Sequence, residues 1–280
     1  AGVFLFLKNG AGKKDSRFSG EKEVFAPPSW AWGAVLILAV WVRLYRLTTL
    51  SSWPILDDGT TGYLGSEIAR GVEVPWYFEF NHSPMFYQYG FALFLKMFGA
   101  SLQTLWLYPA LWSVASVFLL WRAALRLGDN VFAFLLTAIW AVSFPILYTG
   151  RFATPQVLLM FGVVLAFYFW VRWRQAKDGS AIVWVAALGL TAGLGFHVYI
   201  SWAVIAVLIV VAFHFGAGTQ KITNAQKVAF WIPFLGLALP TILFVVKNPN
   251  SYLLKTLEPG EMGGWERWRI FFSYFTVHFW

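Results

Sequence analysis

Long apolar segments without charge recur along this chain and constrain its fold more than any other feature. A stretch of roughly 18 or more such residues is long enough to cross a hydrocarbon core about 30 Å thick. Only 12% of the 280 residues are charged, whereas 59% are hydrophobic, and a soluble domain usually carries about 25% charge. The sequence therefore predicts an all-α integral membrane protein, a multi-pass helical bundle without a soluble domain.

The charge-free runs and their flanks predict seven membrane spans. We expect them at residues 30–47, 104–121, 131–149, 155–171, 181–197, 198–214 and 228–246. The shorter segment 84–99 carries Gln88 and Lys96, and we interpret it as a helix lying in or near the membrane interface. Leaving it out of the spans places the basic clusters on one side, as the positive-inside bias prefers.

This topology divides the chain into a basic cytoplasmic segment, residues 1–29, and a transmembrane domain, residues 30–280. The long loop 48–103 and a second loop from 247 are then extracytoplasmic. Because the chain starts at Ala1 and stops at Trp280 inside an aromatic run, we expect it to be truncated at the C-terminal end. The net charge of +8 fits this orientation better than a nucleic-acid partner, and the absence of Cys excludes disulfides and thiolate sites.

Two acidic residues lie side by side just after the first predicted span. Asp57 and Asp58 open a segment with helical spacing, whose stop we expect at Gly71. One of the pair can cap that helix, since Asp is a preferred capping residue. The other can then point into a cavity, where a low-dielectric wall raises the proton affinity of a carboxylate and suits it as a general base for a hydroxyl. Tyr63 and Glu67 on the same helix are candidate substrate-binding residues, although Glu67 can equally face water.

Two further polar residues belong to the same outer face. His82 opens the segment 84–99 and is a candidate substrate-binding residue, or else a helix cap or an interfacial side chain. Arg151 lies in a very short turn at the outer end of a span. Its guanidinium either reaches for the interface or contacts a phosphate, for which its shape is suited. Arg43 and Arg46 are interpreted as interfacial anchors.

These residues, in this order, resemble the GT-C superfamily of membrane glycosyltransferases. The nearest branch is glycosyltransferase family 39, which includes the protein O-mannosyltransferases. The motifs that carry the resemblance are the acidic pair, Arg43-Leu44-Tyr45, His82-Ser83-Pro84-Met85, Phe98-Gly99, Gly150-Arg151-Phe152 and Gly195-Phe196-His197-Val198-Tyr199. The chain departs from the family pattern at Asp58, where Glu is usual, at Ser83, where Pro is usual, and at Gln156, where several relatives carry Asp.

The resemblance implies a transferase that takes a sugar from a polyprenyl-phosphate carrier at the extracytoplasmic face of the cell membrane, with inversion at the anomeric carbon. Asp57 aligns with the catalytic acidic residue of the family, and Arg151 is a candidate cation for the leaving phosphate. The acceptor would be a hydroxyl of a lipid, glycan or protein. We expect no cofactor: adjacent carboxylates and His82 could hold Mg²⁺ or Mn²⁺, but this branch is generally described as metal-independent.

Two other classes of function stay open. A multi-pass transporter or a flippase for a lipid-linked sugar needs no transferase chemistry. Ion-coupled carriers usually hold ionisable groups within their spans, and here only His197 and His214 come near. A scaffold subunit without catalysis predicts that Asp57→Asn leaves function intact, whereas the transferase hypothesis predicts loss of activity with folding unchanged.

Overall fold

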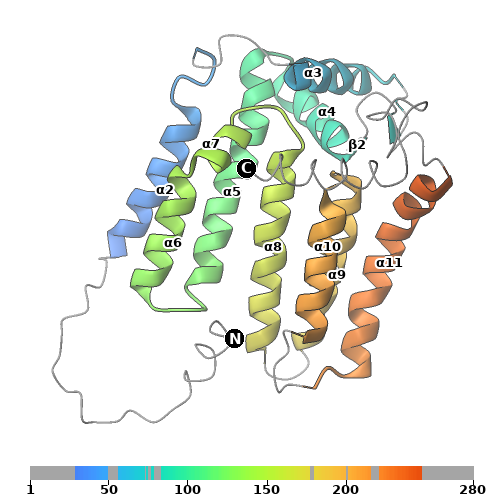
Figure 1. Ribbon diagram of the computed structural model, residues 1–280. Helices are drawn as coiled ribbons and strands as arrows, with labels where there is room; N and C mark the ends of the chain where they lie inside the picture. Colours follow the sequence, from blue (N-terminus) through green and yellow to red (C-terminus); the bar gives the residue numbers. More distant parts are fainter. Residues whose placement is uncertain are drawn as a thin grey trace, which may run out of the picture.

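The computed structural model describes residues 29–49, 56–72, 74, 77–78, 83–176, 180–199, 201–215 and 221–247. Within these ranges nearly all regular structure is helical (Figure 1). The helices that run along the bundle are α2 (Ser29–Leu44), α5 (Leu102–Ala124), α6 (Asn130–Val142), α8 (Gln156–Gln175), α9 (Ser180–Leu194), α10 (Trp202–Phe215) and α11 (Asn224–Lys247). The remaining elements are α3 (Leu56–Ala69), α4 (Phe86–Phe98), α7 (Phe144–Thr149), the 3₁₀ turn η1 (Gly195–His197) and a two-residue antiparallel pair, β1 (Tyr77–Phe78) with β2 (Ser83–Pro84).

Each predicted span is largely helical, which confirms the prediction of a helical membrane protein. Four of these helices are long and apolar enough to cross a membrane: α5, α8, α9 together with η1, and α11. The other three, α2, α6 and α10, are shorter apolar helices. The number of seven spans therefore stays a prediction, because only four of the described helices are long enough to cross a membrane unaided.

The predicted span 131–149 is not one continuous helix. The chain leaves the helix at Ser143, whose backbone is extended, and α7 starts beside Pro145. Proline has no N–H, so Pro145 cannot bond the carbonyl four residues earlier, that of Ala141. The buried Arg43 guanidinium supplies the missing donor, with its Nη1 3.0 Å from the Ala141 oxygen. The break is thus compensated by a side chain from α2, as a membrane-embedded carbonyl requires.

Neighbouring helices alternate in direction, so the connections gather at two ends of the bundle (Figure 1). The turn before α8 and the turn after η1 lie at the end that carries α3 and α4. The turns after α5 and α8 lie at the other end, together with the start of α11. This arrangement agrees with the predicted alternation of the loops. Which end faces the cytoplasm stays a prediction.

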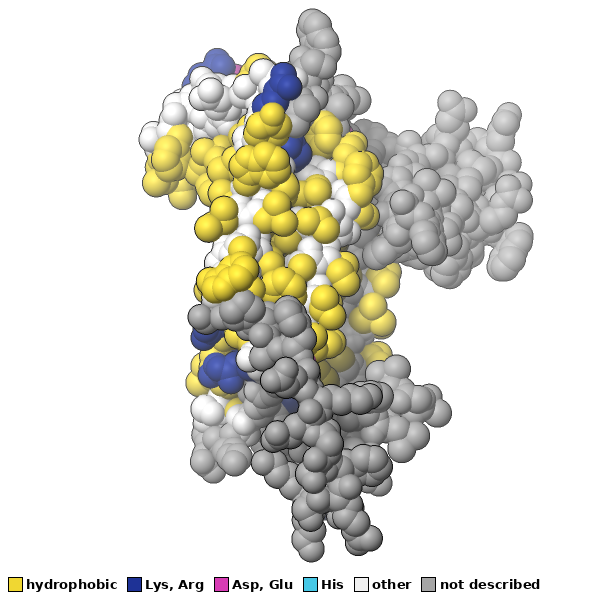
Figure 2. Space-filling model, turned by 90° about the vertical axis from the view of Figure 1, so that its left-hand side faces the viewer, with side chains coloured by type: hydrophobic (Ala, Val, Ile, Leu, Met, Phe, Trp, Pro, Cys, Tyr) yellow, Lys and Arg dark blue, Asp and Glu magenta, His cyan; other side chains and the backbone are white. Residues whose placement is uncertain are grey.

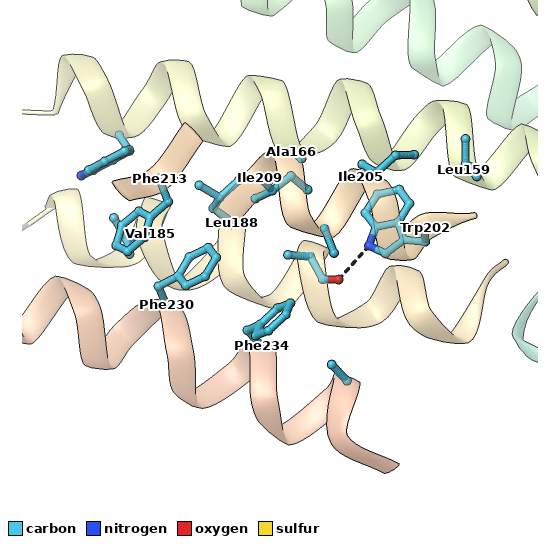
Figure 3. Close-up of a cluster of buried hydrophobic side chains, with 14 of the residues drawn as sticks. Leu159, Ala166, Val185, Leu188, Trp202, Ile205, Ile209, Phe213, Phe230 and Phe234 are labelled. Carbon is cyan, nitrogen blue, oxygen red and sulfur yellow. Dashed lines mark hydrogen bonds between the residues drawn. The ribbon is translucent and has the colours of Figure 1, made fainter. Parts of the chain in front are cut away.

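The closest helix packing joins α9 to α11. Gly189 and Gly193 are one turn apart, and the backbone of α11 lies where their side chains would be: a Cβ on Gly189 would be 2.2 Å from the carbonyl oxygen of Phe230. Beside this seam, Phe213 of α10 stacks on Phe230 with ring centroids 4.4 Å apart (Figure 3). Small residues spaced in this way are typical of close helix pairs in membranes, where packing rather than water exclusion drives association.

The outer surface of the bundle is strongly apolar. Figure 2 shows hydrophobic side chains covering most of the described surface on one side, with basic side chains near both ends. Several large aliphatic residues are more than three-fifths exposed, among them Ile37, Ile139 and Val183. A soluble protein rarely exposes so continuous an apolar area, whereas lipid chains are a suitable solvent for it.

Candidate functional site at the end of the bundle

Helix α3 holds the acidic pair across the end of the bundle (Figure 1). Asp57 and Asp58 lie within its first turn rather than before it, since α3 begins at Leu56. The prediction that one of them precedes the helix as its cap is therefore wrong. Carboxylates in the first turn still favour the helix through its dipole. The predicted stop is confirmed, because Gly71 follows the helix with a φ of +89°.

The two carboxylates have different environments. Asp58 is completely buried, whereas Asp57 is exposed. Asp58 Oδ1 accepts the backbone N–H of Ala153 at 2.5 Å, and its Oδ2 accepts the indole N–H of Trp106 at 3.3 Å. These donors come from the turn before α8 and from α5, so Asp58 fixes the start of α3 to two other elements. Asp57 is thereby left on the outside of a fixed helical turn.

Tyr63 and Glu67 lie further along α3. They are one turn apart, but at about 100° per residue both are rotated by roughly 80–120° from the direction of Asp57. Tyr63 is mostly exposed, and Glu67 pairs with Arg70 at 3.2 Å. The structure therefore places these residues on the same helix as Asp57 without bringing their side chains to it. His82 lies outside the described residues.

Arg151 occupies the turn between α7 and α8. Its Nη1 donates to the carbonyl of Val42 at 2.9 Å, and its Nη2 donates to the carbonyls of Tyr45 at 2.9 Å and Arg46 at 3.4 Å. These are the orphan carbonyls at the end of α2, which need donors from elsewhere. In its described contacts Arg151 therefore caps the end of α2, a segment more than 100 positions away in the sequence. Partial burial lowers its pKa, although a guanidinium stays protonated in proteins.

Arg43 is completely buried, so the prediction of an interfacial anchor is wrong for this residue. Its Nε donates to Ser113 Oγ at 2.7 Å, and its Nη1 donates to the carbonyls of Ala39 and Ala141, each at 3.0 Å. The side chain thus joins α2 to α5 and α6. The sequence does show Arg43 near the end of one span and Pro145 within another. It does not show that the two spans pack together, because that contact joins distant segments.

The segment 84–99 forms the predicted helix, α4, which lies beside α3 at this end of the bundle (Figure 1). Its buried face carries Tyr87 and Gln88, two residues that sequence reasoning did not assign to the site. Within the described structure, the Tyr87 hydroxyl and both amide atoms of Gln88 are buried without a hydrogen-bond partner. Burial, the nearby Tyr108 and the charge of Asp58 raise the pKa of Tyr87 well above its usual value, so Tyr87 is a neutral hydroxyl near Asp58.

Gln156, which replaces an expected Asp, opens α8 close to Ala153. Its Nε2 donates to the Tyr199 hydroxyl at 3.5 Å, and its Oε1 is buried with no partner in the described structure. Polar atoms of α4 and α8 are therefore buried without a described partner, and α4 packs against α3. No group of three metal-ligating side chains occurs among the described residues; metal independence stays a prediction.

A family model for dolichyl-phosphate-mannose-protein mannosyltransferases matches residues 81–247. This is more than half of the chain, and it extends from the segment before α4 to the end of α11. No curated protein and no solved structure matches the sequence. The acidic pair on α3 precedes the matched segment, so its assignment depends on the site geometry. The chain belongs to the dolichyl-phosphate-mannose-protein mannosyltransferase family and is a membrane glycosyltransferase of the GT-C type.

Proposed function

We propose that this protein transfers a sugar from a polyprenyl-phosphate donor to a hydroxyl acceptor at the extracytoplasmic face of the cell membrane, with the N-terminus in the cytoplasm. Asp57 acts as the general base. The observation that carries this assignment is the different environment of the two adjacent carboxylates on α3. Asp58 is buried and hydrogen-bonded, whereas Asp57 is exposed at the end of the bundle.

The proposed reaction is a single displacement at the anomeric carbon. Asp57 takes the proton of the acceptor hydroxyl while the acceptor oxygen forms its bond to that carbon. The bond between the carbon and the phosphate oxygen breaks, and polyprenyl phosphate leaves with the electron pair. One displacement inverts the configuration. A fixed α3 matters because a base must stay within hydrogen-bond reach of the proton it removes, about 2.6–3.2 Å.

The leaving phosphate gains negative charge, which a preorganised cation would stabilise. Arg151 is our candidate, because this residue lies in the same turn as Ala153, the backbone partner of Asp58. Tyr63, Glu67 and His82 are proposed to contact the sugar or the acceptor. A lipid-linked donor reaches this end of the bundle by lateral diffusion along the apolar surface, so a nucleotide-binding loop is not required.

The second hypothesis is a transporter or flippase for a lipid-linked sugar. His197 is one of the two histidines near the predicted spans, but its Nε2 is 2.7 Å from the carbonyl oxygen of Leu237 and its Nδ1 is 3.3 Å from Thr241 Oγ1. These contacts hold η1 against α11 and give His197 a structural role. We therefore favour the transferase.

The test compares the whole wild-type protein with Asp57→Asn in proteoliposomes that contain a panel of polyprenyl-phosphate sugars and candidate acceptors. Free polyprenyl phosphate and the glycosylated acceptor are measured together. Asp129→Asn is the matched control, because Asp129 is exposed at the start of α6 and Asn also caps a helix well. We expect both products from the wild type and the control, and neither from Asp57→Asn at equal amounts of folded protein. Full activity of Asp57→Asn would refute the assignment of the base, and translocation of the donor without transfer would favour the flippase.

A further inference from the structure

A basic pocket lies at the end of the bundle opposite to α3. Its volume is about 310 Å³, and it is lined by Arg126, Arg172, Gln175, Ala176, Ser180 and Trp184. The two arginines follow or belong to the last turns of α5 and α8, and Ser180 begins α9. Because α5 has 23 residues and rises about 1.5 Å per residue, the pocket is roughly 30 Å or more from the acidic pair. It is therefore a separate site.

The pocket is built for an anion. Its described lining residues include no carboxylate, and within the described structure neither Arg126 nor Arg172 forms an ion pair. The Arg172 guanidinium lies 4.2 Å from the centroid of the Trp184 ring, a contact that fixes its orientation. Gln175 Nε2 donates to the Arg126 carbonyl, which holds the turn after α5 against α8. The start of α9 adds the positive end of a helix dipole, which also favours a phosphate.

The surroundings of the pocket favour a lipid as the source of that phosphate. Leu127, beside Arg126, is exposed, and so are Ile182 and Val183 in the first turn of α9. Figure 2 shows basic side chains at the lower edge of the apolar surface. Acyl chains could therefore lie along exposed apolar residues while a headgroup phosphate meets the two guanidinium groups. Basic pockets between membrane helices are suited to anionic lipid headgroups.

We propose that this pocket binds the phosphate of an anionic membrane lipid at the end of the bundle remote from the proposed active site. The inference does not depend on the transferase mechanism. Arginine provides two parallel N–H groups for phosphate oxygens. Arg126 lies in the turn after α5, and Arg172 belongs to α8. The bound lipid would join the turn after α5 to the last turn of α8 and the start of α9.

In the test, the whole protein is reconstituted in nanodiscs that contain equal amounts of phosphatidylglycerol and phosphatidylcholine with identical acyl chains. The protein is then released from the nanodiscs together with the lipids that stay bound to it. Native mass spectrometry measures the ratio of the two lipids retained. The double variant Arg126→Gln/Arg172→Gln is compared with Lys221→Gln/Lys227→Gln, which removes two exposed charges at the same end but outside the pocket. Ser180→Glu is a second pocket variant, which adds a carboxylate where a helix start tolerates one.

We expect wild type and the lysine variant to retain phosphatidylglycerol preferentially. Each pocket arginine should contribute about fivefold to that preference, so the arginine variant should lose most of it, and Ser180→Glu should lose it as well. An equal loss in the lysine variant would overturn the proposal, because it would indicate attraction to the whole basic end. An unchanged ratio in both pocket variants would also overturn it. Displacement of the lipid by millimolar inorganic phosphate would show a site for free phosphate instead.

Discussion

The packing of α9 on α11 leads to a quantitative prediction for Gly189→Ala. The new Cβ would lie 2.2 Å from the carbonyl oxygen of Phe230, whereas ordinary contacts begin at 3.4 Å, so the two helices must separate by about 1.2 Å at this point. The obstacle is backbone, which cannot rotate away. Overpacking of this kind costs about 1–3 kcal/mol, and we take the upper end. Replacing a helical glycine by alanine returns about 1 kcal/mol, which leaves a net loss of about 2 kcal/mol.

The assay is thermal unfolding of the purified protein in detergent, followed by tryptophan fluorescence. A loss of about 2 kcal/mol should lower the Tm by roughly 4–8 °C for a chain of this size. Gly236→Ala in α11 is the matched control, because a Cβ there meets nothing within 4 Å, and its Tm should be unchanged or higher. If Gly189→Ala were as stable as Gly236→Ala, the close backbone contact between α9 and α11 would be wrong.

Three further predictions concern the site. Asp58→Asn replaces a carboxylate oxygen by an amide group that faces the Ala153 or Trp106 donor, and it should cost about 1.5–3 kcal/mol; the exposed Asp57→Asn should change the Tm far less, which the same melts measure. Arg151→Ala removes the donors to the end of α2 and should lower stability by about 1–2 kcal/mol, so its activity must be compared per amount of folded protein. Tyr87→Phe removes a buried hydroxyl without a described partner and should be neutral or stabilising. Because the pKa of Tyr87 is raised in the folded state, the unfolded state loses the hydroxyl proton at a lower pH than the folded state does. Above pH 10 the free energy of unfolding of the wild type should therefore fall, relative to Tyr87→Phe, by up to about 1.4 kcal/mol per pH unit. Parallel stability profiles of the two proteins between pH 9 and 11 would contradict the burial of Tyr87.

The helices could be predicted from the sequence because their signal is local. Runs of apolar residues identify membrane helices at any place in the chain, and the polar residues of 84–99 separated α4 from the longer helices. The sequence analysis did not predict the helix break at Ser143, although Pro145 is a residue that can cause one. Proline within a membrane helix is often tolerated, so its effect depends on whether another donor reaches the freed carbonyl.

The roles of the candidate site residues stay predictions, and the sequence indicated only part of their geometry. The resemblance selected Asp57 over Asp58, but the residue pattern alone treats two adjacent carboxylates alike. Their environments differ because consecutive side chains on a helix point about 100° apart. Which of the two faces the bundle depends on the hydrogen bonds of Asp58 to Trp106 and Ala153, which are 48 and 95 positions away. Arg43 was taken for an anchor for the same reason: its partner Ser113 is 70 positions away.

The sequence by itself determined that this protein consists of membrane helices, because apolar composition and the need to satisfy backbone groups in lipid act within each segment. It also determined which residues are available for chemistry at the end of the bundle. Only the tertiary structure decided that Asp58 is buried while Asp57 stays exposed, that Arg151 caps α2, and that Arg126 and Arg172 share a pocket. These roles depend on contacts between distant segments, and the packing of the helices alone brings those segments together.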